Sequence, residues 1–412
     1  MEKSKLNNTV DKGRNGHVVI VTSVPFPNGF APANRIMAYA KGFTENNYSC
    51  EVVVIKPNIE KSNKGFKTDG VFEDVKYKFP GNIINANEKN ILIRQFQYQY
   101  SVIKSLLYIV YNTLIKKQSD IIIYYGTDVF VELQLTILSH LFNVVILTEQ
   151  SEKPLLYNSE KLLPKSIVKF LYYKIIFKRY TGILAMTVPI RAFFCNIGIP
   201  ADKILLISHT VSLHRFEGTM MNSNEQYYAF TGSLNEQKDG VLSLLDSLAI
   251  VKLKYPEIKL KVAGYGSEID VELFRQKIKD LGLFRNVDYL GSLQGIDAIK
   301  LIQNARALVS FRPSSIQAEY GFPTKVVEYL ATGNPVITTL TGDLRLFLIN
   351  NENSFTTSPG DIEGFAKQWI IILQDFDSAK KVGAQGKELV MNVFNPKIQT
   401  KKIISYYMNL NQ

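Results

Sequence analysis

The sequence contains only two cysteines, Cys50 and Cys195, among 412 residues. Two thiols are too few for a disulfide framework, which favours a reducing compartment. The chain also lacks an uninterrupted apolar run of the roughly 18 residues that a membrane-spanning helix needs. Residues 1–16 are too polar for a signal peptide. These absences argue against a disulfide-stabilised secreted domain and predict a cytoplasmic protein.

Metal-binding and nucleophile motifs are missing as well. The four histidines are scattered and the cysteines are unpaired, so no metal-ligand pattern is present. There is no GxxxxGK[ST] phosphate loop and no GxSxG nucleophile motif. Asp375 and Asp377 form an Asp-x-Asp pair after a predicted helix, a position typical of solvated surface. We therefore expect neither a metal nor a cofactor.

Acidic residues are outnumbered by basic ones, 37 to 48, which gives a net charge of +11. Such a balance predicts an anionic partner: a nucleic acid, an anionic lipid or a phosphorylated substrate. No nucleic-acid recognition motif is present, so we expect no nucleic acid. The length and the 46% hydrophobic content predict a globular chain of about two domains.

The first half of the chain reads as alternating strands and helices. A strand at 17–23, a Pro/Gly loop containing Gly29, a helix at 32–43 and a strand at 51–55 predict the opening of a doubly wound α/β domain. Further strands are predicted at 120–124, 144–148, 182–187 and 203–207. The polar stretch 218–226 predicts a linker between two domains.

Residues 311–343 carry the clearest functional signal. A strand at 307–311, a helix from Pro323 to Gly333 and a strand at 336–340 predict a βαβ unit. The backbone N–H groups before this helix, together with its dipole, suit a phosphate or sugar oxygen. The carboxylate of Glu328, further along the helix, is suited to accept hydrogen bonds from vicinal hydroxyl groups. The alternative is a purely structural βαβ unit with a surface Glu328–Lys325 pair.

The string G-F-P-x-K-x-x-E-Y-L-A-x-G-x-P-V-I in this unit closely resembles the nucleotide-sugar site of family 4 (group 1) glycosyltransferases. These are retaining enzymes of the GT-B fold, with two Rossmann-like doubly wound domains facing across a cleft. The resemblance implies that Glu328 holds the ribose. Tyr320 stands where the family has a first glutamate that contacts the donor sugar, and Glu319 lies one residue earlier. In the resembling segment G-R-L-x-x-x-K-G, Lys238 matches the lysine and Ser233 replaces the arginine.

The resemblance covers nearly the whole chain. It implies an acceptor-binding domain at 1–217, a donor-binding domain at 227–395 and a last helix, 396–412, that crosses back to the first domain. The implied catalytic residues are Lys238, Tyr320 and Glu319. The implied donor-binding residues are Ser233, Gly264, Tyr265, Gly266, Gly321, Phe322, Thr324, Lys325 and Glu328. The implied acceptor-binding residues are Gly29, Arg35 and Glu149.

Two stretches of the first domain, 88–118 and 153–180, mix apolar residues with cations. Basic amphipathic helices of this kind lie on anionic bilayers, although a core-facing helix with a solvated back is the alternative. We therefore expect an enzyme on the inner face of the membrane that transfers sugar from a nucleotide-diphosphate donor to a glycan or lipid-linked acceptor in cell-surface polysaccharide or glycoconjugate biosynthesis. The departures at Tyr320 and Ser233 leave open a non-catalytic homologue that binds a glycan or stabilises a partner.

Overall fold

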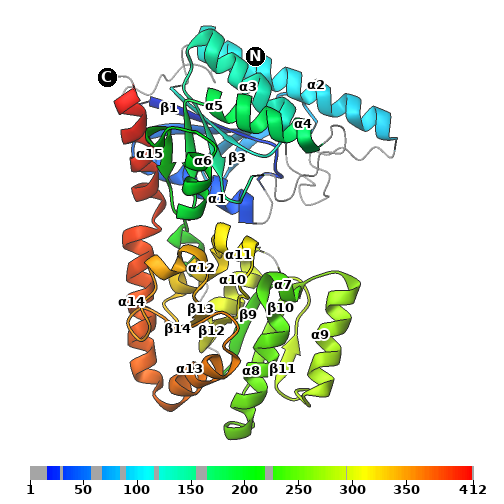
Figure 1. Ribbon diagram of the computed structural model, residues 1–412, viewed down its shortest axis with the longest axis vertical. Helices are drawn as coiled ribbons and strands as arrows, with labels where there is room; N and C mark the ends of the chain where they lie inside the picture. The colour runs from blue at the N-terminus through cyan, green and yellow to red at the C-terminus, as the bar shows by residue number, and fades with distance from the viewer. Residues whose placement is uncertain are drawn as a thin grey trace, which may run out of the picture.

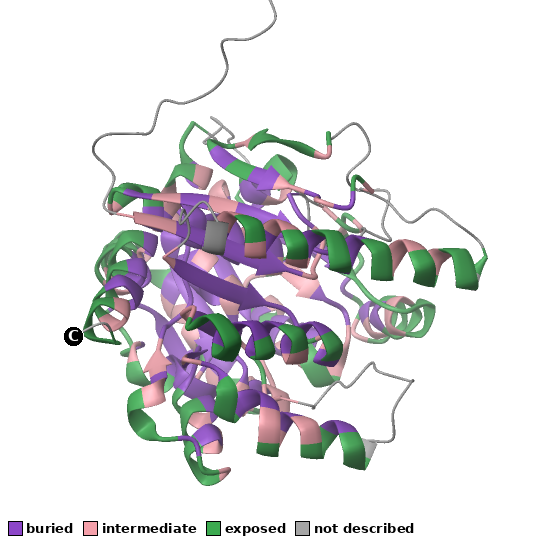
Figure 2. Ribbon diagram, turned by 90° about the horizontal axis from the view of Figure 1, so that it is seen from above, coloured by how far each residue is buried: buried purple, intermediate pink, exposed green. Residues whose placement is uncertain are grey.

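The strands assemble into two separate sheets, one above the other in Figure 1. The computed structural model describes residues 16–27, 31–56, 67–83, 90–115, 120–154, 165–218, 226–293 and 295–410. Gly29 and most of the predicted linker, residues 219–225, lie outside this described part. Helices cover both sheets, so the strands form the buried layer in the view from above (Figure 2).

The first sheet has the strand order β3-β4-β2-β1-β5-β6-β7-β8, and only the β3–β4 pair is antiparallel. Its strands are β1 (Gly16–Thr22), β2 (Tyr48–Val54), β3 (Asp69–Phe72), β4 (Val75–Lys78), β5 (Ile121–Tyr125), β6 (Ile146–Gln150), β7 (Gly182–Ala185) and β8 (Ile204–Leu206). The central strands are buried on both faces, which explains why they read as continuous apolar runs rather than alternating ones. Its helices and helical turns are α1 (Ala31–Glu45), α2 (Ile91–Val110), η2 (Tyr111–Ile115), α3 (Val129–Phe142), α4 (Lys165–Phe170), η3 (Leu171–Ile176), α5 (Phe177–Arg179), α6 (Val188–Asn196), η4 (Ala201–Lys203) and η5 (Leu213–Phe216).

The second sheet is parallel throughout, with the order β11-β10-β9-β12-β13-β14. Its strands are β9 (Tyr228–Ser233), β10 (Leu260–Tyr265), β11 (Val287–Tyr289), β12 (Ala307–Ser310), β13 (Val336–Thr339) and β14 (Phe355–Thr357). The helices and helical turns that follow β9 in the chain are α7 (Glu236–Asp239), α8 (Val241–Lys254), α9 (Glu268–Asp280), α10 (Gly295–Gln303), α11 (Ile316–Tyr320), α12 (Thr324–Thr332), η6 (Gly342–Leu346), α13 (Ile362–Gln374), α14 (Phe376–Val393) and α15 (Pro396–Leu410).

The predicted pair of doubly wound α/β units is confirmed, but the stretch before Pro323 differs from the prediction. The predicted unit has no helix between the strand at 307–311 and Pro323, whereas the structure has the short helix α11 there. Ser315 caps this helix, because its Oγ accepts the backbone N–H of Ala318 at 3.0 Å. A single turn of helix carries too little periodicity to be read from sequence, whereas the longer α12 lies where it was expected.

The end of the chain returns to the first sheet. Helices α14 and α15 run up one side of the molecule, and α15 packs on α1 (Figure 1). The Asn46 side-chain amide donates to the carbonyl oxygen of Lys397 at 2.8 Å and to Thr400 Oγ1 at 3.0 Å. Gly42 permits this close approach, since a Cβ there would lie 2.5 Å from the carbonyl oxygen of Pro396.

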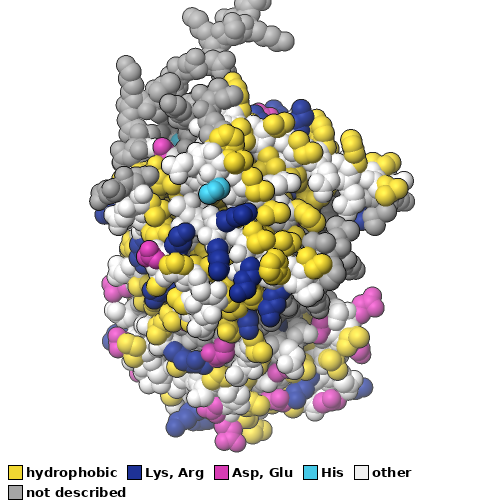
Figure 3. Space-filling view, turned by 45° about the horizontal axis from the view of Figure 1, so that its top comes forward, with side chains coloured by type: hydrophobic (Ala, Val, Ile, Leu, Met, Phe, Trp, Pro, Cys, Tyr) yellow, Lys and Arg dark blue, Asp and Glu magenta, His cyan; other side chains and the backbone are white. Residues whose placement is uncertain are grey.

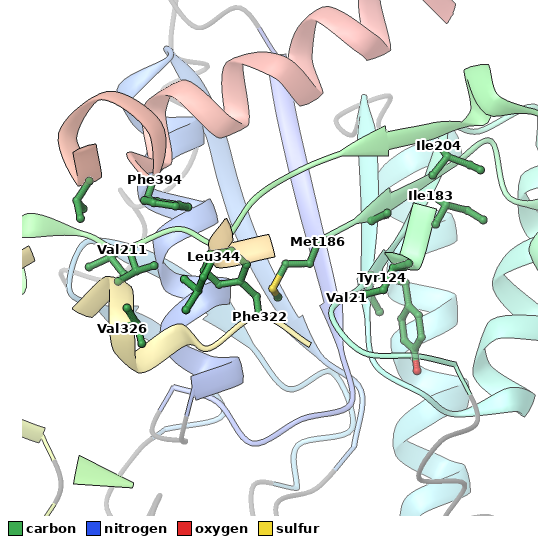
Figure 4. Close-up of a cluster of buried hydrophobic side chains, with 14 of the residues drawn as sticks. Val21, Tyr124, Ile183, Met186, Ile204, Val211, Phe322, Val326, Leu344 and Phe394 are labelled. Carbon is green, nitrogen blue, oxygen red and sulfur yellow. The ribbon is translucent and has the colours of Figure 1, made fainter. Parts of the chain in front are cut away.

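One hydrophobic cluster crosses from the first sheet into the second domain (Figure 4). Met186, after β7, and Phe394, before α15, contribute to it together with Phe322 and Val326 of the second domain. A shared core of this kind holds the two sheets at one separation. Among the described helices, none combines the length and the hydropathy that crossing a bilayer requires.

Replacing Gly42 by alanine should loosen α15 from α1. Alanine favours the helix intrinsically, but its methyl group would collide with backbone atoms, which cannot rotate away. We expect a net loss of about 1–3 kcal/mol in the free energy of unfolding, measured by urea denaturation. The control Lys401→Ala changes an exposed side chain of α15 and should cost under about 0.5 kcal/mol. Equal stability of Gly42→Ala and the parent protein would contradict this packing.

Candidate active site

Loops that follow β12 and β13 of the second sheet contact the first domain directly. Thr187 Oγ1 donates to the backbone carbonyl of Tyr320 at 2.8 Å. The backbone N–H of Val188 donates to Asp343 Oδ2 at 2.7 Å, at the N-terminus of α6. Carboxyl ends of parallel strands are where folds of this class bind ligands. The surface between the domains therefore contains the candidate site.

Glu328 lies on α12 at this surface, with a side chain 26% exposed. Its Oε1 accepts from Arg215 Nη1 at 2.6 Å. Arg215 belongs to η5, in the segment that joins the two sheets, and it is not among the residues predicted from the sequence. A lone arginine outside any motif has no signal in the sequence, and its partner is 113 positions away. Glu328 therefore pairs with Arg215, and Lys325 pairs with Asp239 instead of with Glu328.

Lys325, on the first turn of α12, reaches the end of β9. Its Nζ lies 2.7 Å from Asp239 Oδ2, and Asp239 Oδ2 also accepts the backbone N–H of Ser233 at 2.7 Å. Gly232 makes this possible, because a Cβ there would overlap the Lys325 ammonium group. Burial lowers the pKa of Lys325, and the nearby Asp239 carboxylate opposes that effect.

Further cations surround the same carboxylate. Burial alone would raise the pKa of Asp239, but Lys325 and then Arg312 hold it below its usual value. Arg312 and Lys238 also lower the pKa of Lys325 through like-charge repulsion. Lys238 is exposed, and its Nζ lies 5.9 Å from the centre of the Tyr265 ring. The end of β9 is thus a concentrated positive region.

Gly264 and Gly266 flank Tyr265 at the end of the neighbouring strand β10. A Cβ at Gly264 would lie 2.6 Å from Leu234 Cδ2, so glycine allows the two strand ends to lie close together. Tyr265 is half exposed. The structure therefore brings Ser233, Lys238 and these three residues to one edge of the sheet.

The loop before α12 departs from the prediction at two residues. The N–H of Gly321 donates to the carbonyl of Gln317 at 2.9 Å, so this amide is already used by α11 and does not face a ligand. Glu319 forms two hydrogen bonds with Arg345, at 2.8 and 3.0 Å, and lies on the exposed side of the loop. Gly321 has a φ of −83°, which any residue can adopt, so this glycine introduces no unusual backbone turn after Tyr320.

Tyr320 and Phe322 lie on the side of the loop that faces the first domain. The Lys153 Nζ is 4.6 Å from the centre of the Tyr320 ring. Phe322 is buried and contacts His209, Phe347 and Phe394, with ring centres 6.1, 6.2 and 5.7 Å away. The Phe322 side chain therefore fixes the loop rather than contacting a ligand, and Thr324 follows it at the half-exposed start of α12.

In the first domain, Arg35 and Glu149 form a buried ion pair, with Nε and Oε1 2.8 Å apart. Arg35 also donates to Tyr39 and to the backbone carbonyl oxygens of Ile207 and Ser208. Since Arg35 is only 2% exposed, its predicted acceptor contact is corrected to a structural role. Burial raises the pKa of Glu149, and the Arg35 charge opposes this effect. Glu149 lines a cavity, but its charge is directed to Arg35.

The described residues contain no group of three or more His, Cys, Asp or Glu side chains that could hold a metal ion. What the site offers instead is an arrangement of cations, a helix N-terminus and a carboxylate at the edge of a parallel sheet. Such an arrangement can bind phosphate groups and vicinal hydroxyls.

The two Rossmann-like sheets and the site between them define the GT-B class of glycosyltransferase fold. Residues 225–375 match the family described as "Glycosyl transferases group 1". A glycosyltransferase from Rickettsia africae has the same fold over 97% of this chain and 99% of its own, with a TM-score of 0.70 and 20% identity. HepE from Anabaena, solved with UDP and glucose, matches over 96% of this chain and 100% of its own, with a TM-score of 0.65 and 14% identity.

A relative by sequence is the "Putative glycosyltransferase EpsD" of Bacillus subtilis, which is 26% identical over 218 residues. That match spans 52% of this chain and 55% of the relative, so the chain spans about half the length of this curated relative. The predicted fold is therefore confirmed, and residues 225–375 are similar to the group 1 glycosyltransferases.

The Lys325–Asp239 pair should contribute measurably to stability. Lys325→Met would leave a buried carboxylate without its nearest cation, and we expect a loss of about 3 kcal/mol in the free energy of unfolding. The matched control is Lys277→Met, which breaks the Lys277–Asp246 pair of equal length, 2.7 Å, on the surface. This control should cost under about 1 kcal/mol. If Lys325→Met and Lys277→Met lost the same free energy of unfolding in urea, another cation would have taken the place of Lys325 beside Asp239.

Proposed function

We propose that this protein is a retaining, metal-independent glycosyltransferase that uses a nucleotide-diphosphate sugar. The observation that carries the proposal is the position of Glu328 and the helix start at Thr324 beside the cation-rich end of β9. In this assignment Glu328 accepts hydrogen bonds from the ribose hydroxyls. Gly264, Tyr265 and Gly266 border the base. The ligands in the HepE structure, UDP and glucose, support a donor of this class.

The diphosphate is assigned to the positive region at the end of β9. Lys238, Lys325 and Arg312 carry three positive charges and Asp239 one negative charge, a net charge of +2 for these four side chains. A diphosphate gains negative charge on its leaving oxygen as the glycosidic bond breaks, so nearby cations stabilise the transition state more than the bound donor. Lys325 supplies the positive charge that the family's arginine would have provided at Ser233.

Tyr320 is assigned to the donor-sugar pocket. It lacks the carboxylate that the family has there, but its hydroxyl group can hydrogen-bond a sugar hydroxyl and its ring can pack on the pyranose. In the retaining mechanism that the resemblance implies, the leaving phosphate itself helps to deprotonate the acceptor. Since this mechanism needs no protein carboxylate at the position of Tyr320, the absence of the family's glutamate there is compatible with activity.

The departures at Tyr320 and Ser233 also support a second candidate function. A homologue that binds nucleotide sugar or glycan without transferring it would tolerate both changes. The two candidates differ in one measurement, the release of free nucleoside diphosphate. We favour the enzyme because the surrounding cations are retained.

Two surface regions support binding to a membrane. Helix α2 exposes a row of large apolar side chains: Leu92, Ile93, Phe96, Ile103 and Leu107 are 46–76% exposed. The helical segment 165–179 contains five cations and no acidic residue. In Figure 3, Lys and Arg side chains gather beside hydrophobic ones on the upper face of the molecule. Apolar groups and cations on one face suit an anionic bilayer, and we assign the protein to the inner face of the membrane.

The proposed function is tested by incubating the protein with a panel of nucleotide sugars and alkyl glycosides and measuring the released nucleoside diphosphate. Glu328→Ala should abolish most turnover. It should also weaken the binding of the matching nucleoside diphosphate about 10- to 100-fold in titration calorimetry. Glu268→Ala removes an exposed carboxylate on α9 and serves as the control. Nucleotide binding without release, for every sugar tested, would favour the non-catalytic alternative.

Membrane binding is tested by sedimentation with vesicles. The protein should sediment with phosphatidylglycerol vesicles and much less with phosphatidylcholine vesicles, because binding depends on charge. Reversing the exposed cations Lys169, Lys174 and Lys178 to glutamate should release it. The control reverses Lys254, Lys279 and Lys300, three exposed cations of the second domain, with the same change in net charge. Equal effects of the two triple variants would contradict a localised surface.

A further inference from the structure

Lys153, in the loop after β6, reaches from the first domain to Tyr320 in the second. Its ammonium group lies 4.6 Å from the centre of the Tyr320 ring. In the described part of the chain, the Lys153 side chain forms no ion pair and no hydrogen bond, and its neighbour Glu152 is exposed to solvent. An ammonium group has three N–H donors, and contact with a ring face gives none of them an oxygen acceptor. The charge of Lys153 is therefore available to a ligand.

The backbone at Tyr320 is held in place by contacts that do not involve Lys153. Thr187 Oγ1, from the first domain, donates to the backbone carbonyl of Tyr320 at 2.8 Å. Two residues further on, the buried Phe322 ring packs against Phe394 with ring centres 5.7 Å apart. The loop thus has a hydrogen bond and a packed ring to fix it. A role toward a ligand explains the position of Lys153 better than a role in holding this loop.

The carboxylates of the surrounding segments are each held by another group. Glu149, at the end of β6, pairs with Arg35 inside the first domain. Glu319, next to Tyr320, pairs with Arg345. The carboxylate of Asp343 accepts a backbone N–H at the start of α6. These contacts direct the three negative charges to partners other than the ammonium group over the Tyr320 ring.

A second cation, Arg312, connects Tyr320 with the assigned diphosphate site. Its Nη2 would lie 3.7 Å from a Cβ at Gly321, the residue after Tyr320. Together with Lys325, Arg312 opposes the effect of burial and holds the pKa of Asp239 below its usual value, so it is also close to the end of β9. A nucleotide sugar joins its sugar directly to the second phosphate, and the sugar must therefore lie beside the diphosphate. Arg312 places Tyr320 at that distance.

The charge around Tyr320 is opposite in sign to the charge that the resemblance implies at this position. The family has a glutamate there, and an ionised carboxylate would repel a negatively charged sugar. This chain has an uncharged phenol instead, with the Lys153 ammonium group over its ring and the Arg312 guanidinium group beside the next residue. Two cations with no carboxylate between them attract a negatively charged group.

We propose that Lys153 selects a donor whose sugar carries a carboxylate, as in a nucleotide-diphosphate hexuronic acid. The inference rests on the proposed function for the place of the donor and adds the class of its sugar. The ammonium group of Lys153 donates to the carboxylate at C6, and the Tyr320 ring packs on the apolar face of the same sugar ring. Lys153 is thus a specificity-determining residue that the first domain contributes to the donor site.

Titration calorimetry with donor pairs that differ only at C6 tests the inference: UDP-glucose and UDP-glucuronate, UDP-galactose and UDP-galacturonate, GDP-mannose and GDP-mannuronate. We expect at least one uronate to bind about 5- to 20-fold more tightly than its hexose. Lys153→Met should reduce this ratio to less than about twofold, whereas Lys153→Arg, which retains the charge, should preserve most of it. The matched control Lys56→Met removes another half-buried lysine of the first domain from a tyrosine ring, that of Tyr98 at 4.9 Å, and should leave the ratio unchanged.

A purely structural role of Lys153 would make Lys153→Met weaken the hexose and the uronate equally, and that result would overturn the inference. Equal effects of Lys153→Met and Lys56→Met would overturn it as well, because they would reflect only the lost net charge. Equal affinities of the parent protein for both members of every pair would overturn the inference and leave the proposed function standing, since a nucleotide sugar still binds. No binding of any nucleotide sugar would overturn the proposed function together with the inference that rests on it.

Discussion

The packing of Phe322 between the two domains is the contact on which the geometry of the site depends. This ring lies against Phe394 at the start of the returning helix, against Phe347 after η6 and against His209 between the sheets. Burial lowers the pKa of His209 well below its usual value, so the stacked ring is neutral. Because close-packed interiors do not deform continuously, fixing Phe322 also restricts Tyr320 and Thr324, which lie two positions before and after it in the chain.

Charged groups around this core are held in pairs whose members come from different elements. Arg35 and Glu149 are sealed within the first domain, so their pairing is structural. The Arg215 and Glu328 side chains are each about a quarter exposed, so both charged groups already contact water. A ligand can therefore replace one residue of the ion pair without removing much more water from the other. Lys325 is intermediate, with a side chain 16% exposed. The degree of burial thus separates charges that maintain the fold from charges that can bind a substrate.

Much of the fold was predictable from local pattern. Continuous apolar runs indicated the central strands, and Pro323 and Gly333 marked the ends of α12 to within one residue. These predictions depend on side-chain periodicity and backbone preference, which act between residues close in sequence. The grouping of Ser233, Lys238 and the Gly264–Gly266 turn came from the resemblance, and the structure places them together because β9 and β10 are neighbouring parallel strands.

The sequence by itself determined which residues stand at strand ends and on helix faces, whereas only the tertiary structure decided their partners. It showed that Gly321 donates to α11, that Glu319 turns outward to Arg345 and that Arg35 is sealed against Glu149. It also paired Lys325 with Asp239 and Arg215 with Glu328, which are 86 and 113 positions apart. Such pairs depend on how whole elements pack, and local sequence contains no information about the distance between two charges once the chain has folded.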